Sequence, residues 1–330
     1  MRRAQRTRAA AAVAVVATAV AALLSGCSSA SSTTSPPEST ATVTATPGPA
    51  IADGPATITV GGVERTFVVR TPDGGGSRGA ASDWAPESST DERLPVMIAL
   101  HGVGGSGSDF ERYTGLTDAA GDRMMVVYPD GLPVPDGRRV WNAGDCCNPA
   151  NTVPTDDIGF LRALIEDLRD RGADTEQVYL AGFSNGGMLA YRAACEMGES
   201  IAGIAVIAGA LTVDDCGNGD AAPVPLLVIH GMEDTIVPFD GGPLSAGVDE
   251  GLEGVEFRSV QESVAVWRDR NGCAASPAHN TIGSADVAQY SECAVRGDIT
   301  VVALPDGEHT WVATDGSSDA TPVILNTFGL

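Results

Sequence analysis

The sequence contains no lysine: its 20 basic residues are all arginine, and they face 43 aspartates and glutamates. The resulting formal charge of −23 over 330 residues argues against a nucleic-acid-binding protein and against charge-driven docking on anionic lipid. Aromatic residues are also scarce, at 5%, so a broad surface for stacking sugars is not indicated. Hydrophobic residues nevertheless make up 43% of the chain and charged residues 19%, which is a globular and not a disordered composition.

The N-terminal segment is typical of an export signal. Four arginines within residues 1–8 precede an uncharged, mostly apolar stretch over residues 9–24. This stretch is shorter than the roughly 20 apolar residues of a membrane-spanning helix. The run Leu24-Ser25-Gly26-Cys27 resembles a bacterial lipobox, which predicts a signal peptide over residues 1–26 and lipidation of Cys27. An ordinary signal peptide with an incidental cysteine is the alternative.

Residues 27–55 consist mainly of serine, threonine and proline. Such a segment buries too little apolar surface to offset the entropy lost on ordering it, so we expect a semi-extended tether. Residues 56–330 contain no internal repeat and no second linker of comparable length. This predicts that residues 56–330 form a single folded domain after the tether.

Apolar segments alternate with amphipathic ones along this domain. A hairpin with a Gly61-Gly62 turn opens it, and Val96–Leu100 is an apolar run typical of a strand buried on both faces. Asp156 or Asp157 is expected to cap a following helix, and Ser259 opens a capping box. Further strands are expected at residues 124–128, 178–183, 201–208, 226–229 and 299–304, and helices at residues 158–171, 185–197 and 259–271. This alternation predicts an α/β fold with a mostly parallel sheet flanked by helices.

Gly182-Phe183-Ser184-Asn185-Gly186 matches the pattern G-x-S-x-G. The pattern alone is weak in a chain with 40 glycines, but here an apolar strand precedes it and a helix follows it. A nucleophile elbow requires this strand–turn–helix context, because the serine sits in a strained turn at the end of a strand. Side chains at positions 182 and 186 would collide with the neighbouring chain. Ser184 is the predicted nucleophile, and an incidental serine in a tight turn is the alternative.

A serine hydroxyl needs a base, and the chain contains four histidines. In enzymes with this elbow, the acid and then the base follow the serine along the chain. His101 and His230 each end a buried strand just before a glycine, where a structural histidine is the better interpretation. His279 lies in a polar stretch typical of a surface loop. His309 follows the strand at residues 299–304 through a short loop, and it is the predicted base.

The acid that orients this base is predicted to be Asp234. It follows the strand at residues 226–229, and ligand and catalytic sites of open α/β sheets lie at the carboxyl ends of the strands. Glu233 is the neighbouring competitor. The remaining acidic candidates lie in a polar loop before that strand, where solvation is the simpler interpretation: Asp214, Asp215 and Asp220.

An oxyanion hole needs two N–H donors aimed at the developing negative charge. The backbone of Asn185, directly after the nucleophile, is expected to supply one of them. The second is expected from the glycine-rich loop after Val96–Leu100, from Val103 in the first instance and Gly102 otherwise. A merely flexible glycine loop would have the same sequence.

Seven cysteines are present, and lipidation of Cys27 leaves six, which in an exported protein suggests three disulfides. The candidate pairs are Cys195 with Cys216, Cys273 with Cys293 and, unless each has another partner, the vicinal Cys146 and Cys147. The alternative of metal binding has neither a C-x-x-C motif nor a histidine cluster to support it. We therefore expect no metal and no cofactor.

Several segments together are far more specific than the serine motif. They are residues 100–106, 127–131, 141–147, 156–160, 182–188, 230–234 and 308–311. In these segments the chain resembles the single-domain polyhydroxybutyrate depolymerase and feruloyl esterase group of α/β-hydrolases, in its bacterial lipoprotein branch. The resemblance implies the α/β-hydrolase fold and carboxylic-ester hydrolysis by Ser184, Asp234 and His309. It also implies that Trp141 and Trp311 lie near the acyl or alcohol pocket, a core position being the alternative for each.

Motifs and resemblance together predict a serine esterase that works through an acyl-enzyme outside the cytoplasm, anchored to the membrane through Cys27. The expected partner is its substrate, a small-molecule or oligomeric ester. The sequence leaves the oligomeric state of the protein open. Hydroxyalkanoate oligoesters, feruloyl or acetyl esters of polysaccharides, and lipid esters remain as substrate classes. The alternative function is a non-catalytic surface lipoprotein that uses a hydrolase scaffold for adhesion or binding.

Overall fold

The computed structural model describes residues 52–72, 93–146, 155–214, 216, 222–243, 255–311 and 319–330. The predicted signal peptide, Cys27 and nearly all of the predicted tether lie outside these residues. The described residues all belong to one structural unit, Thr46–Leu330. Its first strand begins at Gly54, two residues before the predicted start of the domain.

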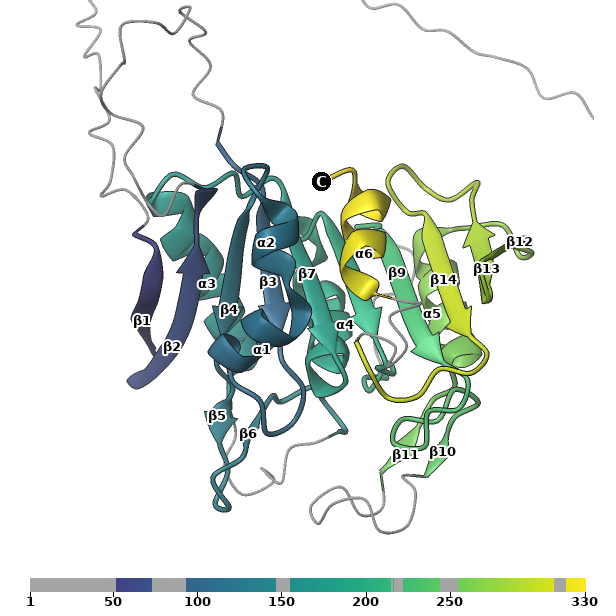
Figure 1. Ribbon diagram of the computed structural model, residues 1–330, viewed down its shortest axis with the longest axis horizontal. Helices are drawn as coiled ribbons and strands as arrows, with labels where there is room; N and C mark the ends of the chain where they lie inside the picture. Colours follow the sequence, from purple (N-terminus) through teal and green to yellow (C-terminus); the bar gives the residue numbers. More distant parts are fainter. Residues whose placement is uncertain are drawn as a thin grey trace, which may run out of the picture. The chain divides into compact units, whose positions relative to one another are not determined.

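A ten-stranded sheet runs through the described residues, in the order β1-β2-β4-β3-β7-β8-β9-β14-β13-β12 (Figure 1). Its strands are β1 Gly54–Val60, β2 Val63–Arg70, β3 Val96–Leu100, β4 Met125–Pro129, β7 Val178–Phe183, β8 Gly203–Ile207, β9 Leu226–Gly231, β12 Ala278–Ile282, β13 Ala285–Tyr290 and β14 Ile299–Leu304. The strands from β4 to β14 in this order run parallel, and the pairs outside them are antiparallel. The prediction of a mostly parallel sheet is confirmed.

The first two strands form the predicted hairpin. Gly61 and Gly62 have φ values of 58° and 83°, a left-handed backbone that glycine adopts without strain. Two small antiparallel pairs lie outside the main sheet. They are β5 Leu132–Pro133 with β6 Arg139–Val140, and β10 Gly242–Pro243 with β11 Glu256–Phe257.

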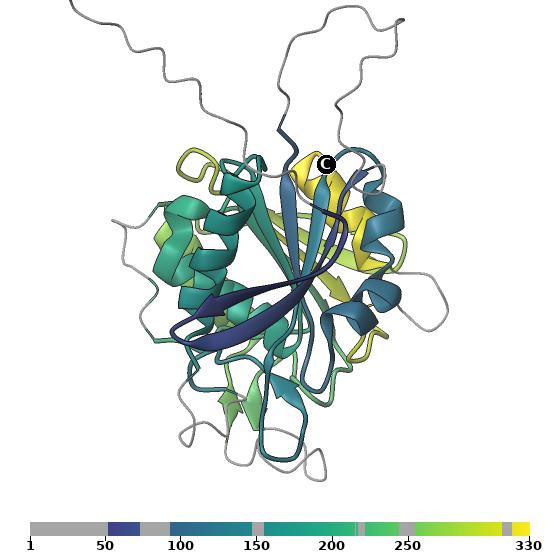
Figure 2. The same ribbon diagram turned by 90° about the vertical axis from the view of Figure 1, so that its left-hand side faces the viewer.

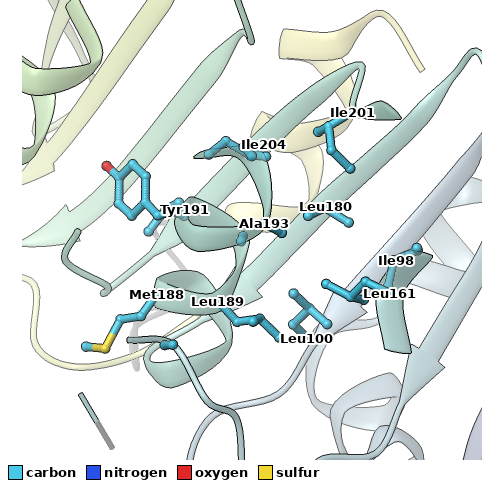
Figure 3. Packing of buried hydrophobic residues seen from close by; sticks show 14 of the residues in the cluster. Ile98, Leu100, Leu161, Leu180, Met188, Leu189, Tyr191, Ala193, Ile201 and Ile204 are labelled. Atoms are coloured by element: carbon cyan, nitrogen blue, oxygen red, sulfur yellow. The ribbon is translucent and has the colours of Figure 1, made fainter. Parts of the chain in front are cut away.

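Helices cover both faces of the sheet (Figures 1 and 2). On one face lie α1 Gly107–Thr114, α2 Leu116–Ala120 and α6 Ala320–Phe328. On the other lie α3 Asp157–Asp170, α4 Asn185–Met197, which ends in a short 3-10 turn at Gly198–Ser200, and α5 Val260–Asn271. Alternate residues of one strand therefore enter two separate cores: Ile98 and Leu100 pack under α3 and α4, and Met97 and Ala99 pack on the other side. Figure 3 shows part of the first core, where Leu161 and Leu189 pack against Ile98 and Leu100.

The helix caps follow the sequence closely. Of the two candidates for α3, Asp156 is the cap and accepts a hydrogen bond from the N–H of Gly159 at 2.8 Å. Asp157 instead pairs with Arg65 of β2 at 2.7 Å, with both side chains buried. Ser259 and Glu262 form the predicted capping box at the start of α5, and Gly272 caps the end of this helix.

His279 differs from its prediction. It lies on β12, which pairs with β13 at the edge of the sheet, and not in a loop. The polar composition reflects exposure, since every residue of this edge strand is exposed. Among the helices of the described ranges, none is both long enough and apolar enough to span a bilayer.

Candidate active site

Ser184 occupies the turn between the central strand β7 and helix α4. Its φ of 54° and ψ of −122° are rarely adopted by a residue with a side chain, and such conformations cost of order 1–3 kcal/mol. The turn is held by a hydrogen bond from the N–H of Ser184 to the carbonyl of Ile207 at 2.8 Å. Within the described structure its side chain makes no capping bond to α4, so the hydroxyl is left for other partners.

Glycine at positions 182 and 186 is required by close packing around this turn. A Cβ atom at Gly182 would overlap the backbone carbonyl of Gly186, and one at Gly186 would overlap the carbonyl of Leu100. The helix therefore starts directly against the ends of β7 and β3. Its N-terminus, with unpaired backbone N–H groups, points to the space beside Ser184 and favours negative charge there.

Asp234 and His309 lie side by side, although 75 residues separate them. Nδ1 of His309 is 2.7 Å from Oδ2 of Asp234. The two loops that carry them follow the adjacent parallel strands β9 and β14, and backbone hydrogen bonds join them: Met232 donates to Leu304 and Glu233 to Gly307. Glu233, the alternative acid, has no such contact with His309 among the bonds of the described residues.

The carboxylate of Asp234 is almost completely enclosed and fully hydrogen-bonded. Its Oδ1 accepts from the N–H groups of Ile236 and Val237, at 2.8 and 2.9 Å. Burial acts to raise the pKa of this carboxyl, but hydrogen bonds from His230 and His309 outweigh it and hold the pKa well below its ordinary value. The group is thus a stable anion beside the imidazole of His309.

His230 is a member of this arrangement that the sequence analysis assigned to structure alone. Its Nε2 lies 2.8 Å from the carbonyl of Val237 and 3.3 Å from Oδ2 of Asp234, and its side chain is buried. Two histidines therefore contact the same carboxylate oxygen. The signal for this was available in the chain, since His230 ends the strand that delivers Asp234, but only the fold of the loop back onto β9 brings the groups together.

The loop after β3 packs against the nucleophile. Gly102 lies so close to Phe183 and Ser184 that an added Cβ would be 3.1 Å from the ring of Phe183 and 3.3 Å from the Cβ of Ser184. The N–H of Gly104 donates to the carbonyl of Arg139 at 2.8 Å, and Gly105 donates to Gly102 at 3.2 Å. The predicted oxyanion donors at Gly102 and Val103 therefore belong to a hydrogen-bonded loop that adjoins Ser184.

Trp141 is buried behind this loop, in the core position that was the alternative interpretation, and a role near the acyl or alcohol pocket stays a prediction. Its side chain is 0% exposed, and its Nε1–H donates to the carbonyl of His101 at 2.8 Å. Its backbone N–H donates to Oδ1 of Asn185 at 2.7 Å, and Nδ2 of Asn185 donates back to its carbonyl at 3.1 Å. Because the indole satisfies a buried carbonyl, it packs inward and joins the two segments of the predicted oxyanion hole.

Trp311 likewise occupies a core position, the alternative interpretation for this residue. It is 2% exposed, and its Nε1–H donates to Oγ1 of Thr321 on α6 at 3.0 Å. Its ring meets that of Phe110 on α1 edge to face, at 5.2 Å between centroids. The residue thus anchors the chain segment that follows His309, since a buried indole N–H requires a partner of this kind.

Two of the predicted disulfides are present, Cys195–Cys216 and Cys273–Cys293. The first joins α4 to the segment that follows β8, and the second joins the segments directly before β12 and after β13. Cys146 is buried and Cys147 lies outside the described residues, so the third pairing stays a prediction.

A family model described as phospholipase/carboxylesterase matches residues 85–263, more than half of the chain. The chain belongs to this family of α/β-hydrolases. The matched segment includes Ser184 and Asp234 and ends before His309, which the fold then brings beside Asp234.

Proteins that are similar to this chain include feruloyl esterases. Feruloyl esterase B of Piromyces equi is 29% identical over 226 residues, covering 66% of this chain and 40% of that protein. Feruloyl esterase C of Emericella nidulans is 29% identical over 190 residues, covering 54% of this chain and 64% of that protein. The chain thus spans less than two thirds of the length of either relative.

Among solved structures, the acetyl xylan esterase from Aspergillus awamori superposes with a TM-score of 0.55, covering 84% of this chain and 99% of that chain. At 14% identity this likeness shows the fold alone. The predicted α/β-hydrolase fold is confirmed, and so is the predicted resemblance to feruloyl esterases. The resemblance to polyhydroxybutyrate depolymerases stays a prediction.

Proposed function

We propose that the protein is a serine esterase that hydrolyses carboxylic esters through an acyl-enzyme. The observation that carries the proposal is the 2.7 Å contact between Nδ1 of His309 and Oδ2 of Asp234, in a fold that holds Ser184 in a strained elbow. When Nδ1–H is donated to Asp234, Nε2 is the nitrogen available to take the proton of Ser184. Phe183, the neighbour of Ser184, has its ring 4.9 Å from that of His309, so both belong to one site.

In the proposed mechanism the oxygen of Ser184 attacks the ester carbonyl as His309 accepts its proton. Asp234 orients the imidazole and stabilises its charged form. The backbone N–H of Asn185 and that of Val103 or Gly102 hold the oxyanion, and losing one such donor costs about 2.7–4 kcal/mol of transition-state stabilisation. His309 then protonates the leaving alcohol, and water that it activates releases the acid from Ser184.

For the substrate, we propose feruloyl or acetyl esters, which the similarity to feruloyl esterases supports. Hydroxyalkanoate oligoesters and lipid esters are the other classes to be tested. The experiment measures release of p-nitrophenol from p-nitrophenyl acetate and butyrate by the purified protein, by Ser184→Ala and by Ser200→Ala, which removes an exposed serine elsewhere. We expect activity in the wild type and in Ser200→Ala only.

A folded wild type with no more activity than Ser184→Ala would contradict the esterase and would favour the non-catalytic binding scaffold. A burst of p-nitrophenol equal to one enzyme equivalent would support the acyl-enzyme. Parallel rates on methyl ferulate, acetylated xylan and 3-hydroxybutyrate oligomers would then rank the ester classes.

We further propose that the protein acts outside the cytoplasm and is held at the membrane by lipid on Cys27. The lipobox supports the anchor, and the Cys195–Cys216 and Cys273–Cys293 disulfides are consistent with an oxidising compartment. Fractionation of cells that express the wild type or Cys27→Ala tests the anchor: the wild type is expected with the membranes and the variant in the soluble fraction. A variant that stays with the membranes would contradict lipidation at Cys27.

A further inference from the structure

Tyr113, in the last turn of α1, reaches across the fold to the segment that follows His309. Its hydroxyl accepts a hydrogen bond from the backbone N–H of Trp311 at 2.9 Å and lies 3.1 Å from Oγ1 of Thr310. These contacts join parts of the chain that are 198 and 197 residues apart. The two residues directly after His309 are therefore both held by one phenol oxygen.

The ring of Tyr113 makes a further contact, with a residue that packs on His309. It meets the ring of Phe183 edge to face, with 6.0 Å between centroids, and Phe183 in turn lies 4.9 Å from the His309 ring. Phe183 is also the residue immediately before Ser184. Tyr113 thus borders both the backbone that carries the proposed base and the ring on which that base packs.

Helix α1 is a firm support for such a contact. It begins immediately after the oxyanion loop, with Ser106 as its cap, and the N–H of Gly107 donates to Oδ1 of Asp130 at 2.9 Å. A Cβ at Gly107 would overlap the carbonyl of Tyr128, so the helix starts in direct contact with β4. One short helix therefore connects the oxyanion loop at its start with the His309 segment at its end.

We infer that Tyr113 is a positioning residue for His309: its hydroxyl and ring hold the His309 segment so that the imidazole keeps its geometry between Asp234 and Ser184. This inference rests on the proposed esterase function. Tyr113 is 45% exposed, so water replaces much of what its hydroxyl contributes to stability. Geometry at the reacting atoms is far more demanding, because a displacement of about 1 Å can lower a rate by roughly a hundredfold.

The test is Tyr113→Phe, which removes the hydroxyl and keeps the ring, with Tyr290→Phe on β13 as the matched control. We expect Tyr113→Phe to lower kcat on p-nitrophenyl butyrate about tenfold, with KM within about twofold of wild type and a midpoint of thermal unfolding close to that of wild type. Tyr290→Phe is expected to retain wild-type kcat. Rates are expressed per active site, counted with a fluorophosphonate that labels Ser184.

A second comparison tests the contact itself. Thr310→Val removes the hydroxyl partner of Tyr113. The double variant is expected to be slower than wild type by much less than the product of the two single effects, because both changes remove the same contact. Wild-type kcat in Tyr113→Phe, or a loss that disappears when rates are expressed per labelled site, would overturn the inference while leaving the esterase proposal intact. An inactive, folded wild type would instead overturn the proposed function.

Discussion

Trp141 and Asn185 hold each other through a reciprocal pair of hydrogen bonds, from the N–H of Trp141 to Oδ1 of Asn185 and from Nδ2 of Asn185 to the carbonyl of Trp141. Asn185 is also the residue whose backbone N–H is the proposed oxyanion donor. The side chain of Asn185 thus holds the backbone of Trp141. The indole N–H of Trp141 in turn donates to the carbonyl of His101, at the start of the other oxyanion segment. Both halves of the proposed oxyanion hole are connected by one buried residue.

Asn185→Ala is expected to lower both stability and rate. The change leaves the N–H and carbonyl of Trp141 buried without partners, at about 1–3 kcal/mol of unfolding free energy for each such group. Asn271→Ala is the matched control, because Asn271 is equally buried and bonds Val224 and Gly297 away from the site. Urea unfolding is expected to show a similar loss for both, and kcat per labelled site to fall about tenfold or more only for Asn185→Ala. Equal kcat in the two variants would contradict the link to the oxyanion hole.

Trp141→Phe tests the indole bond separately from the packing of the ring. It leaves the carbonyl of His101 unpaired, and Trp267→Phe does the same to the carbonyl of Val224, which Trp267 bonds at 2.9 Å. Both tryptophans are 0% exposed, so the two losses of stability are expected to be comparable, about 1–3 kcal/mol. We expect slower acylation of Ser184 in stopped-flow measurements for Trp141→Phe alone. The same slowing in Trp267→Phe would mean a general effect of core loosening.

His230 is expected to affect the rate through Asp234. His230→Leu removes the donor to the carbonyl of Val237 and the second contact to Oδ2 of Asp234, and we expect kcat to fall by more than tenfold. His230→Gln offers an N–H donor of similar reach and is expected to recover part of that loss. The readout is kcat for the two variants at matched folded fractions. If leucine and glutamine gave the same kcat, packing and not the contact to Asp234 would be responsible.

Acid is expected to destabilise the fold through His101. Its Nδ1–H donates to Gly102 at 2.7 Å and its Nε2 accepts from the N–H of Gly131 at 2.9 Å, so the folded protein needs the neutral ring. Burial holds the pKa of His101 below its ordinary value. The unfolded chain therefore binds the proton first as pH falls below about 6.5, and unfolding free energy decreases there by up to about 1.4 kcal/mol per pH unit.

Urea unfolding of the wild type at pH 7.5 and pH 5.5 measures this decrease. His101→Gln is expected to be less stable at pH 7.5 and to lose less on acidification, whereas His279→Gln, at an exposed position, is expected to follow the wild type. A wild-type slope in His101→Gln would show that other groups account for the pH dependence.

Local patterns in the sequence determined much of this protein. The strand, turn and helix around Ser184, the capping box at Ser259, the glycine turn at Gly61 and the identity of the buried strands depend on residues close together in the chain, so the sequence predicted them. The contact between His309 and Asp234 was also predictable, because chain order and parallel strand ends restrict where an acid and a base can meet. Polarity misled at His279, since an exposed edge strand and a loop have the same composition.

Only the tertiary structure decided which way the two tryptophans face and which further groups touch the site. Trp141, His230 and Tyr113 make their decisive bonds to backbone groups of distant segments or of folded loops. Trp311 bonds the side-chain hydroxyl of Thr321 on α6. Every carbonyl and N–H group of the chain is a possible partner for such a side chain, and composition does not distinguish them. The choice among them is made when the two cores close on the sheet, because only then do these four side chains have their partners within reach.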